Sequence, residues 1–376
     1  MNTHYQQIGY RPTWAEIHLK NLVFNFRRVR RLLAAPAKIM VTVKADAYGH
    51  GLIPVSKKLA REKVDYLGVA SIDEGIQLRK AGIRAPILVL GVVLKEDVTP
   101  LFVYGLSATV CSQGLAKALN EKARVLKKKI RVHIKVDTGM GRLGVLAKEA
   151  FEFVKTISRR YPHVHIEGIF THFPSADTDR KFTQRQIASF GRLVKELKNA
   201  GISIPLVHAA NSMGVIGYRN SHFTMVRPGL IIYGLYPKEK IGFFVKPVLS
   251  LKTKVVFTKR VPGGYGISYG RTYITRRPTT IATLPIGYGD GYPRNLSNKA
   301  EVLLRGKKFR ISGRICMDQI MVDVGNTAIK PAEEAVLIGT QRKRHITTEE
   351  LASLSGTIPY EIVCGLGSRI PRVYIE

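Results

Sequence analysis

Short apolar runs alternate with amphipathic segments along the first two-thirds of the chain. Most of the runs are rich in Val and Ile and are apolar throughout, which is typical of parallel strands buried on both faces. The segments between them repeat their apolar residues at helical spacing, most clearly over 16–33, 114–126, 147–160 and 186–200. The pattern therefore predicts eight strands, at 39–43, 66–70, 87–91, 107–111, 132–136, 167–171, 206–210 and 224–228.

Eight consecutive strand–helix units indicate an α/β fold, and specifically a (β/α)8 TIM barrel. A doubly wound open sheet is the alternative arrangement of such units. The number of units in a row favours closure into a barrel.

The pattern changes after Gly234, where helical segments become rare and short β-like runs follow one another between Gly, Pro and Asn. One helix is expected at 347–356, opened by a Thr–Thr–Glu–Glu capping pattern. We therefore predict two domains, a barrel over 1–245 and a β-rich C-terminal domain over 246–376. The expected β runs are 249–257, 279–286, 300–306, 309–313, 320–325 and 335–340.

Length and composition agree with a packed cytoplasmic protein of two domains. The chain has 376 residues, 45% of them hydrophobic. It has no apolar run long enough for a membrane span, and its first twenty residues lack the pattern of a secretory signal. Three cysteines without a CxxC motif favour a reducing compartment and argue against a disulfide framework or a metal site.

The net charge of +33 is unusual and raises the possibility of a nucleic-acid-binding protein. The basic residues, however, are spread along the whole chain, without a basic tail and with only short clusters. Several clusters fall on the polar faces of expected helices. A solvated basic surface is the favoured interpretation, and salt-dependent retention on DNA would test the other.

Polar residues gather where five of the predicted strands end. In a barrel the chemistry lies at the carboxyl ends of the strands. Lys44 ends the first strand, Asp137 and Arg142 follow the fifth, and His172 follows the sixth. Asn211 and Ser212 follow the seventh strand, and Arg227 and Gly229 lie at the eighth.

Two of these groups together suggest a cofactor. Ser212 and Gly229 follow strands seven and eight, the usual phosphate site of this fold. Taken alone, they are also ordinary turn residues. A lysine such as Lys44 in a dry pocket can form a Schiff base. A phosphate site and a pocket lysine together point to a phosphorylated aldehyde cofactor.

Nine motifs resemble those of the alanine racemase family, whose members are pyridoxal-phosphate-dependent enzymes of fold type III. The motifs occur in the same order as in the family and lie in both predicted domains. They extend from residue 43 to residue 361. They are VKADAYGHG (43–51), HIKVDTGMGRLG (133–144), FTHF (170–173), HAANS (208–212), MVRPGLIIYG (225–234), ISYGRTY (267–273), LPIGYGDGY (284–292), GRICMDQ (313–319) and IPYE (358–361).

The resemblance implies a homodimer whose active sites each combine the barrel of one subunit with the β domain of the other. It implies that Lys44 carries pyridoxal 5′-phosphate and that Tyr269 of the partner chain is the second catalytic residue. It further implies a role in the site for each of the following residues: Tyr48, Asn211, Ser212, Gly229, Leu230 and Tyr360 at the cofactor, mainly its phosphate; His172 beside its ring; Arg227 at its pyridine nitrogen; Arg142 and Met317 at the substrate; Tyr288 at the entrance; and Lys135 as a lysine that is carbamylated in some members.

The reaction implied is the interconversion of L- and D-alanine by two bases on opposite faces, supplying D-alanine for peptidoglycan. Lysine and tyrosine have similar ordinary pKa values, about 10.4 and about 10, which suits a substrate and product of equal energy. The chain has Asp46 where the family often has Asn, a change that we expect not to alter the reaction. A racemase of serine or lysine and a barrel-only cofactor carrier are the alternatives; Tyr269 and the β domain argue against the carrier.

Overall fold

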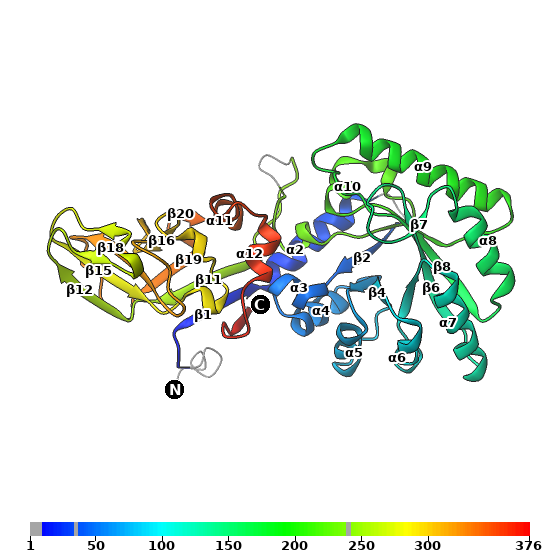
Figure 1. Cartoon of the computed structure of the whole chain (residues 1–376), viewed down its shortest axis with the longest axis horizontal. Helices are drawn as coiled ribbons and strands as arrows, with labels where there is room; N and C mark the ends of the chain where they lie inside the picture. The colour runs from blue at the N-terminus through cyan, green and yellow to red at the C-terminus, as the bar shows by residue number, and fades with distance from the viewer. Residues whose placement is uncertain (1–9, 34–36, 238–241) are drawn as a thin grey trace. The chain divides into compact units, whose positions relative to one another are not determined.

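The computed structural model describes residues 10–33, 37–237 and 242–376, which form two compact units (Figure 1). We call them the barrel unit and the β unit. The barrel unit comprises Phe26–Ala47 and Leu52–Ile232. The β unit comprises the chain up to Asn25, the short segment Tyr48–Gly51 and the remainder from Tyr233 to Glu376.

The barrel unit contains a closed ring of eight parallel strands, which confirms the predicted fold and all eight predicted strands. The ring runs β5–β4–β3–β2–β10–β9–β8–β6, and pairing of β5 with β6 closes it. A two-residue strand, β7 (Val145–Leu146), adds to β6. The ring strands are β2 (Lys38–Thr42), β3 (Tyr66–Val69), β4 (Ile87–Val92), β5 (Ser107–Val110), β6 (Ile130–Asp137), β8 (Val164–Phe170), β9 (Leu206–His208) and β10 (Met225–Val226).

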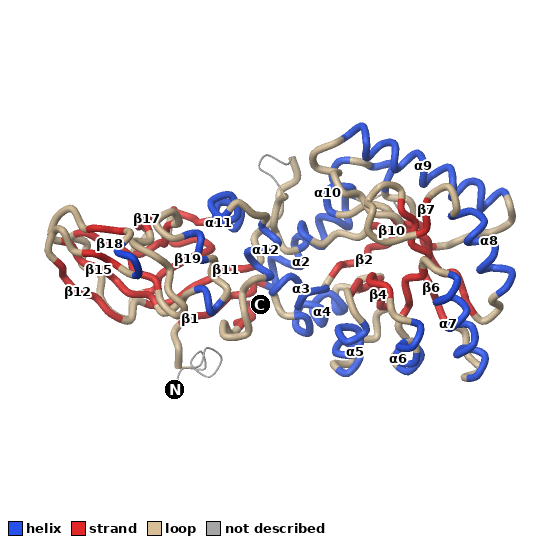
Figure 2. The backbone as a smooth tube through the Cα atoms, viewed as in Figure 1, coloured by secondary structure: helices blue, strands red, loops and turns tan. Residues whose placement is uncertain are grey.

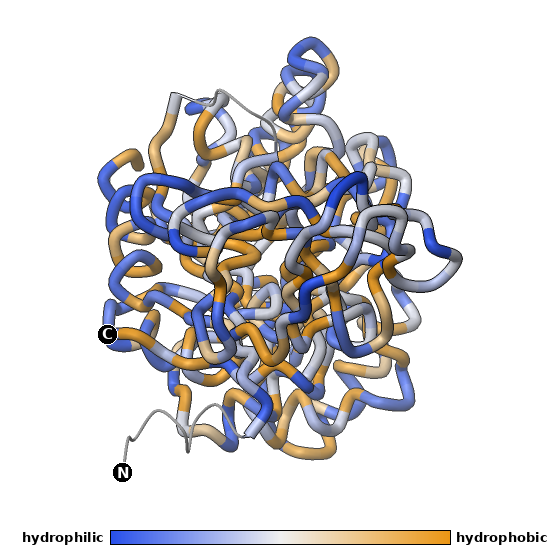
Figure 3. The backbone as a smooth tube through the Cα atoms, turned by 90° about the vertical axis from the view of Figure 1, so that its left-hand side faces the viewer, coloured by the Kyte–Doolittle hydropathy of each residue, from blue (hydrophilic) through white to orange (hydrophobic). Residues whose placement is uncertain are grey.

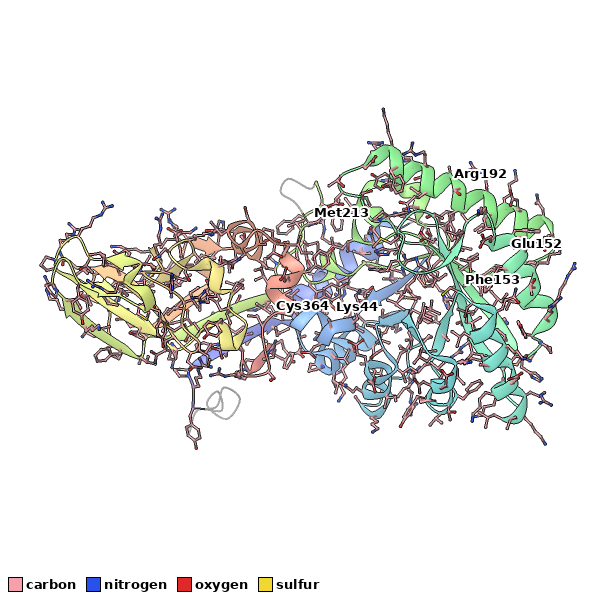
Figure 4. All side chains as sticks on the ribbon, viewed as in Figure 1. Lys44, Glu152, Phe153, Arg192, Met213 and Cys364 are labelled. Carbon is pink, nitrogen blue, oxygen red and sulfur yellow. The ribbon has the colours of Figure 1, made fainter. Side chains whose placement is uncertain are left out.

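Amphipathic helices surround this ring, as Figure 2 shows. In α8, Phe153 is buried whereas Glu152 is exposed, and on α9 Arg192 is exposed; all three are labelled in Figure 4. Apolar residues at helical spacing thus face the strands. The helices are α2 (Leu19–Leu32), α3 (Lys44–Gly49), α4 (Leu52–Arg61), α5 (Ile72–Lys80), α6 (Thr99–Val103), α7 (Gln113–Val125), α8 (Ala150–Arg160), α9 (Arg180–Asn199) and α10 (Ser212–Gly217); α2 and α3 each have residues in both units.

The β unit is built on a seven-stranded sheet with the path β17–β16–β19–β11–β1–β21, to which β20 adds beside β19. A three-stranded sheet, β12–β15–β18, and the hairpin β13–β14 complete it. The strands are β1 (Thr13–His18), β11 (Leu249–Lys254), β12 (Phe257–Val261), β13 (Gly266–Ile267), β14 (Tyr273–Ile274), β15 (Thr279–Leu284), β16 (Glu301–Leu304), β17 (Lys307–Arg310), β18 (Ile320–Gly325), β19 (Glu334–Gln341), β20 (Arg344–Ile346) and β21 (Arg372–Ile375).

In β11 and β18, buried and partly exposed positions alternate with a period of two. Figure 3 colours the backbone by hydropathy and shows hydrophobic and hydrophilic stretches intermingled along the tube. Of the α-helices in the described ranges, α11 (Thr348–Ser355) and α12 (Pro359–Cys364) lie wholly within this unit. Thr347 accepts a hydrogen bond from the amide of Glu350 at 3.0 Å, which confirms the predicted capping pattern of α11.

One predicted element is wrong at its start. A helix was expected from residue 16, but residues 13–18 form β1, and α2 begins only at Leu19. β1 pairs antiparallel with β11 and parallel with β21. These partners are more than 200 residues away in sequence, so local periodicity carries no sign of them.

Within the described ranges, we find no helix with the length and apolar character needed to cross a membrane.

Candidate functional site

Five strand ends bring the predicted polar residues to one end of the barrel. Lys44, labelled in Figure 4, lies two residues beyond β2, and Asp137 is the last residue of β6. His172, Asn211 and Arg227 follow β8, β9 and β10. Because all eight ring strands are parallel, their carboxyl ends lie at the same end of the ring. The prediction that these residues share one end is thus met by the topology.

Lys44 begins a turn with an unusual backbone. The next four residues, Ala45–Tyr48, all have positive φ angles of 52° to 55°, so α3 is a left-handed turn. Left-handed helical backbone costs about 1–2 kcal/mol per non-glycine residue. Such a turn persists only if the surrounding structure holds it.

Two carboxylates hold this turn. Glu74, in the first turn of α5, accepts hydrogen bonds at 2.7 Å from the amides of Ala45 and Ala70. Asp46 accepts a hydrogen bond from the amide of Leu52 at 2.7 Å, where α4 begins. The Asp46 side chain therefore supports the backbone, a role in which the amide oxygen of Asn would also serve.

Arg227 is 5% exposed and is held by acceptors of its own unit. One terminal nitrogen donates to His208 Nδ1 at 2.9 Å. The other donates to the carbonyls of Thr171 and Ala209 at 2.6 and 3.1 Å and lies 3.5 Å from His172 Nδ1. Burial lowers the pKa of Arg227 to about 9, so the guanidinium stays charged near neutral pH. Burial and the charge of Arg227 hold the pKa of His172 well below its ordinary value, which keeps its imidazole neutral.

Lys135, on β6, is a buried amine whose nitrogen finds no hydrogen-bond partner among the described residues. Its Nζ lies 4.7 Å from the ring centre of Phe170. Burial, followed by the charges of Arg227 and Arg142, lowers the pKa of Lys135 to about 7. A substantial fraction of this amine is therefore neutral at physiological pH.

Arg142 is exposed and lies on the loop after β6. Asp137 organises that loop, since its carboxylate accepts hydrogen bonds from three consecutive loop amides: Gly139 and Met140 at 2.8 Å and Gly141 at 2.9 Å. The strand thus fixes the segment that leads to Arg142.

The segments after β9 and β10 are tied together by one hydroxyl. Ser212, which is 5% exposed, accepts hydrogen bonds from the amides of Gly229 at 3.1 Å and Ile231 at 3.4 Å. Asn211 caps α10 by accepting a hydrogen bond from the amide of Gly214 at 3.0 Å. Leu230 is buried beside them. The predicted phosphate-site residues of the barrel unit are thus held together.

The other predicted phosphate-site residues belong to the β unit. The ring of Tyr48 lies 5.8 Å from that of Tyr360 and 4.8 Å from that of Tyr233, measured between ring centres. Burial raises the pKa of Tyr48 far above its ordinary value, so its hydroxyl is a proton donor at any physiological pH.

Tyr269, Met317 and Tyr288 form a second group in the β unit. Tyr269 and Met317 line one surface pocket of about 480 Å³ together with Ser268, Cys316, Asp318 and Gln319. Tyr288 and Gly289 donate backbone hydrogen bonds to the carbonyls of Cys316 and Met317, at 3.0 and 2.9 Å. These three predicted residues are exposed, Tyr269 by 69%.

A buried carboxylate that sequence reasoning missed supports this group. Asp290, which is fully buried, binds Arg11 through both carboxylate oxygens and lies 3.4 Å from Arg369. It also accepts the amide hydrogen of Gly287 at 2.9 Å. Arg369 in turn binds Asp318 at 2.7 Å. The network joins the loops that carry Tyr288 and Met317.

The barrel interior holds a further set of missed polar residues, Tyr66, Ser107, His133, Glu167 and His208. The signal for them is in the sequence. His133 and Lys135 alternate with Val132, Ile134 and Val136 along β6, which places both on the same face of the strand. In the described part of the chain, no group of three or more His, Cys, Asp or Glu side chains is arranged to hold a metal ion.

Comparison with known proteins gives a consistent result over the whole chain. The alanine racemase N-terminal domain family matches residues 17–237, and the alanine racemase C-terminal domain family matches residues 248–374. An alanine racemase of Halothermothrix orenii is 48% identical over 368 residues, 97% of each chain. The solved alanine racemase of Clostridium difficile 630 is 40% identical, with a TM-score of 0.93, over 98% of this chain and 97% of that one. That of Bacillus anthracis, solved with bound L-Ala-P, is 35% identical, with a TM-score of 0.90 and coverage of 98% and 96%.

Proposed function

The chain belongs to the alanine racemase family, and from this premise we propose that Lys44 and Tyr269 are the two bases of a pyridoxal-phosphate-dependent alanine racemase. The enzyme interconverts L- and D-alanine. The observation that carries the residue assignment is the gathering of Lys44, His172, Ser212 and Arg227 at one end of the closed barrel.

The donor set at this end fits pyridoxal 5′-phosphate. The Ser212 hydroxyl and the neighbouring amides near Gly229 are suited to a phosphate, with Asn211, Leu230, Tyr48 and Tyr360 completing its binding site in our proposal. Arg227 supplies a buried cation to an acceptor nitrogen, beside the neutral imidazole of His172. When bound, the cofactor withdraws electrons from the α-carbon of the amino acid and so makes its α-proton acidic.

Each base then serves one hand of the substrate. Lys44 Nζ takes or returns the α-proton on one face, and Tyr269 Oη does so on the other. Arg142 and Met317 would bind the substrate, and Tyr288 would narrow the approach to it. Arg227 cannot give up its proton, so the nitrogen that it faces stays unprotonated.

We propose further that the enzyme is a homodimer with shared sites, in which the partner subunit's Tyr269 completes the site at Lys44. The exposure of Tyr269 and Met317, 69% and 54%, supports this assignment, because a proton-transfer site must exclude water. A second subunit would provide the cover.

Lys135 is suited to carbamylation. The reaction with CO2 requires a neutral amine, and burial with two nearby arginines holds the pKa of Lys135 at about 7. The carbamate would add a negative charge and acceptor oxygens beside Arg142 and Arg227. We propose that it restrains Arg142 at the substrate.

We propose further that the enzyme supplies D-alanine for peptidoglycan and that it is located in the cytoplasm. The three cysteines form no disulfide with one another, which supports a reducing compartment. No step of the proposed reaction depends on the net charge of +33.

Substitution of Lys44 tests the proposed cofactor site. We expect Lys44→Ala to lose the absorbance of a lysine-bound cofactor near the edge of the visible range, together with racemase activity. The neighbouring substitution Asp46→Asn is the control and should retain both. Retention of the cofactor absorbance by Lys44→Ala would refute the assignment.

Mixing two inactive variants tests the shared site. A hybrid of Lys44→Ala and Tyr269→Phe subunits contains one site in which both bases are intact. With free subunit exchange, up to about a quarter of the wild-type activity should return. Failure to recover activity, when mass spectrometry shows that hybrids have formed, would contradict the shared site.

A further inference from the structure

A chain of polar side chains runs through the barrel interior behind Arg227, and all of its members are buried except the last, Glu167, which is partly buried. Arg227 lies 2.9 Å from His208 Nδ1, and His208 Nε2 lies 2.8 Å from His133 Nδ1. His133 Nε2 lies 3.3 Å from Glu167 Oε2. Both histidines are fully buried. Each side chain comes from a different strand or strand end, β10, β9, β6 and β8 in that order.

The chemistry of the groups fixes the direction of this chain. A guanidinium has only donors, so His208 Nδ1 must accept from Arg227. In a neutral imidazole the proton is then on His208 Nε2, which donates to His133 Nδ1. The proton of His133 is therefore on Nε2 and is donated to Glu167. Burial, the largest effect, lowers the pKa of both histidines, in agreement with neutral rings.

Glu167 is the carboxylate in which the chain ends. It also accepts hydrogen bonds from Tyr66 at 2.5 Å and Ser107 at 3.2 Å. Burial acts against ionisation, but the hydrogen bonds from His133 and Tyr66 hold the pKa of Glu167 down to about 2. The chain thus has a positive charge at Arg227, two neutral rings and a negative charge at Glu167.

This carboxylate matters because, among the described residues, Arg227 has no carboxylate within ion-pair distance, and its own partners are imidazoles and carbonyls. A buried cation without a counter-charge is costly. Hydrogen-bond chains polarise their members, so a carboxylate at one end makes the acceptor at the other end stronger.

We propose that Glu167 is a positioning residue of the racemase: it is the counter-charge of Arg227, acting through His133 and His208 to hold the guanidinium in place. The inference rests on the proposed function, in which Arg227 faces the cofactor nitrogen. It adds a residue at the opposite end of a four-residue chain, without contact with cofactor or substrate.

The barrel is built to admit this chain. Gly168 follows Glu167 on β8, and a Cβ atom at Gly168 would lie 2.3 Å from His133 Nδ1. Any other residue would displace the imidazole. A hydrophobic cluster of Met40, Tyr66, Leu88, Leu206 and Met225 packs in the same unit, and Tyr66 joins it to the polar chain through its hydroxyl.

Histidine NMR of the cofactor-free full-length enzyme tests the chain directly. In wild type, 15N-labelled His133 and His208 should both be neutral and protonated on Nε2. Glu167→Gln weakens the final acceptor, so the Nε2–H signals of His133 and His208 should move upfield. Tyr66→Phe removes a competing donor from Glu167, so the same signals should move downfield. A network that merely fills the core predicts no such opposite shifts.

The matched control is Thr109→Val, which removes a buried hydroxyl of the same ring that donates to Val89 at 2.7 Å outside the chain. It should leave both histidine signals unchanged. Unmoved His208 signals in Glu167→Gln and Tyr66→Phe would overturn the proposal, as would an Nδ1-protonated His208 in wild type. If Glu167→Gln does not fold, Tyr66→Phe decides alone.

A second readout uses the enzyme loaded with cofactor. Glu167→Gln should shift the absorption maximum of bound pyridoxal phosphate and lower kcat about tenfold, with KM within about twofold of wild type. An unchanged spectrum and kcat in a folded variant would overturn the proposal while leaving Lys44 in place. Wild-type enzyme that does not take up the cofactor would instead refute the proposed function, and the histidine signals would still decide the chain.

Discussion

The barrel end and the β unit, which are proposed to contribute groups on opposite faces of the substrate, differ in how far those groups are exposed to solvent. At the barrel end, Lys135, Ser212 and Arg227 are each 5% exposed. On the β unit, Tyr269 is 69% and Tyr288 42% exposed. The barrel end buries Lys135, Ser212 and Arg227 with its own chain and so sets the charge states of Lys135 and Arg227 within one subunit, whereas Lys44 is half-buried and Arg142 is exposed. The β unit displays its groups on the surface, where a further surface is needed to remove water from them.

Both regions nevertheless use backbone of positive φ to present a base. Lys44 precedes the left-handed turn over Ala45–Tyr48, and Tyr269 lies between Ser268 and Gly270, with φ angles of 62° and 70°. Such backbone is unfavourable for most residues, so it requires support. At the barrel end, Glu74 and Asp46 bind the amides around the turn, whereas the Ser268 hydroxyl donates to the carbonyl of Arg314 at 2.5 Å.

The largest effect is expected from removal of the desolvated amine at the barrel end. In the fold the pKa of Lys135 is about 7, against about 10.4 in an unfolded chain. Between these values the unfolded state binds more protons, so this group makes stability rise with pH from about 7 to about 10.4. Its cost is therefore greatest at pH 7 and below. Lys135→Met removes that cost and should stabilise the enzyme by a few kcal/mol at pH 7 and by almost nothing at pH 10.4.

Urea unfolding in CO2-free buffer at both pH values measures this difference. Lys129→Met, at an exposed position just before β6, is the control and should show no such pH dependence. A gain for Lys135→Met that is equal at both pH values would contradict the desolvated amine. Added bicarbonate should stabilise only the wild type if the lysine is carbamylated.

Features that depend on residues close together in sequence can be predicted from the sequence, whereas features that depend on residues far apart in sequence cannot. All eight barrel strands were predicted because each is a buried apolar run, a property of its own residues. β1 was missed because its antiparallel partner begins at Leu249, and nothing in residues 13–18 encodes that pairing. The capping pattern at Thr347 was found because it is complete within four residues.

The candidate site divides in the same way. Lys44 and Arg227 were predicted from strand ends, a rule of the barrel fold. Tyr269 came only from the family resemblance, because an exposed tyrosine in a turn has no local signature. Glu167 was missed although it lies on a predicted strand, since its partners His133 and Tyr66 come from other strands. Residues that position the functional groups of a site are thus harder to predict than the functional groups themselves.

A smaller effect is expected where the β unit does bury a charge. Asp290→Asn leaves Arg11 and the Gly287 amide with a weaker acceptor and should lower the free energy of unfolding by about 2–3 kcal/mol, less than for a fully buried pair because Arg11 is partly exposed. The loops bearing Tyr288 and Met317 should loosen, raising KM for alanine. Asp318→Asn, which breaks an exposed pair with Arg369, is the control and should cost no more than about 1 kcal/mol. Equal losses for the two variants in urea unfolding would contradict the buried network.

The smallest effect is expected beside Lys44, the proposed catalytic lysine. Asp46 accepts one hydrogen bond, from the Leu52 amide, and the amide oxygen of Asn can accept the same bond. Asp46→Asn should therefore change stability by less than about 0.5 kcal/mol and kcat by less than about twofold, whereas Asp46→Ala should cost about 1 kcal/mol through the lost cap. Thermal unfolding and racemase assays of the two variants measure both quantities. A large kcat loss in Asp46→Asn with unchanged stability would mean that the carboxylate charge itself acts on Lys44, and the barrel end would then depend on an exposed charge as well as on buried ones.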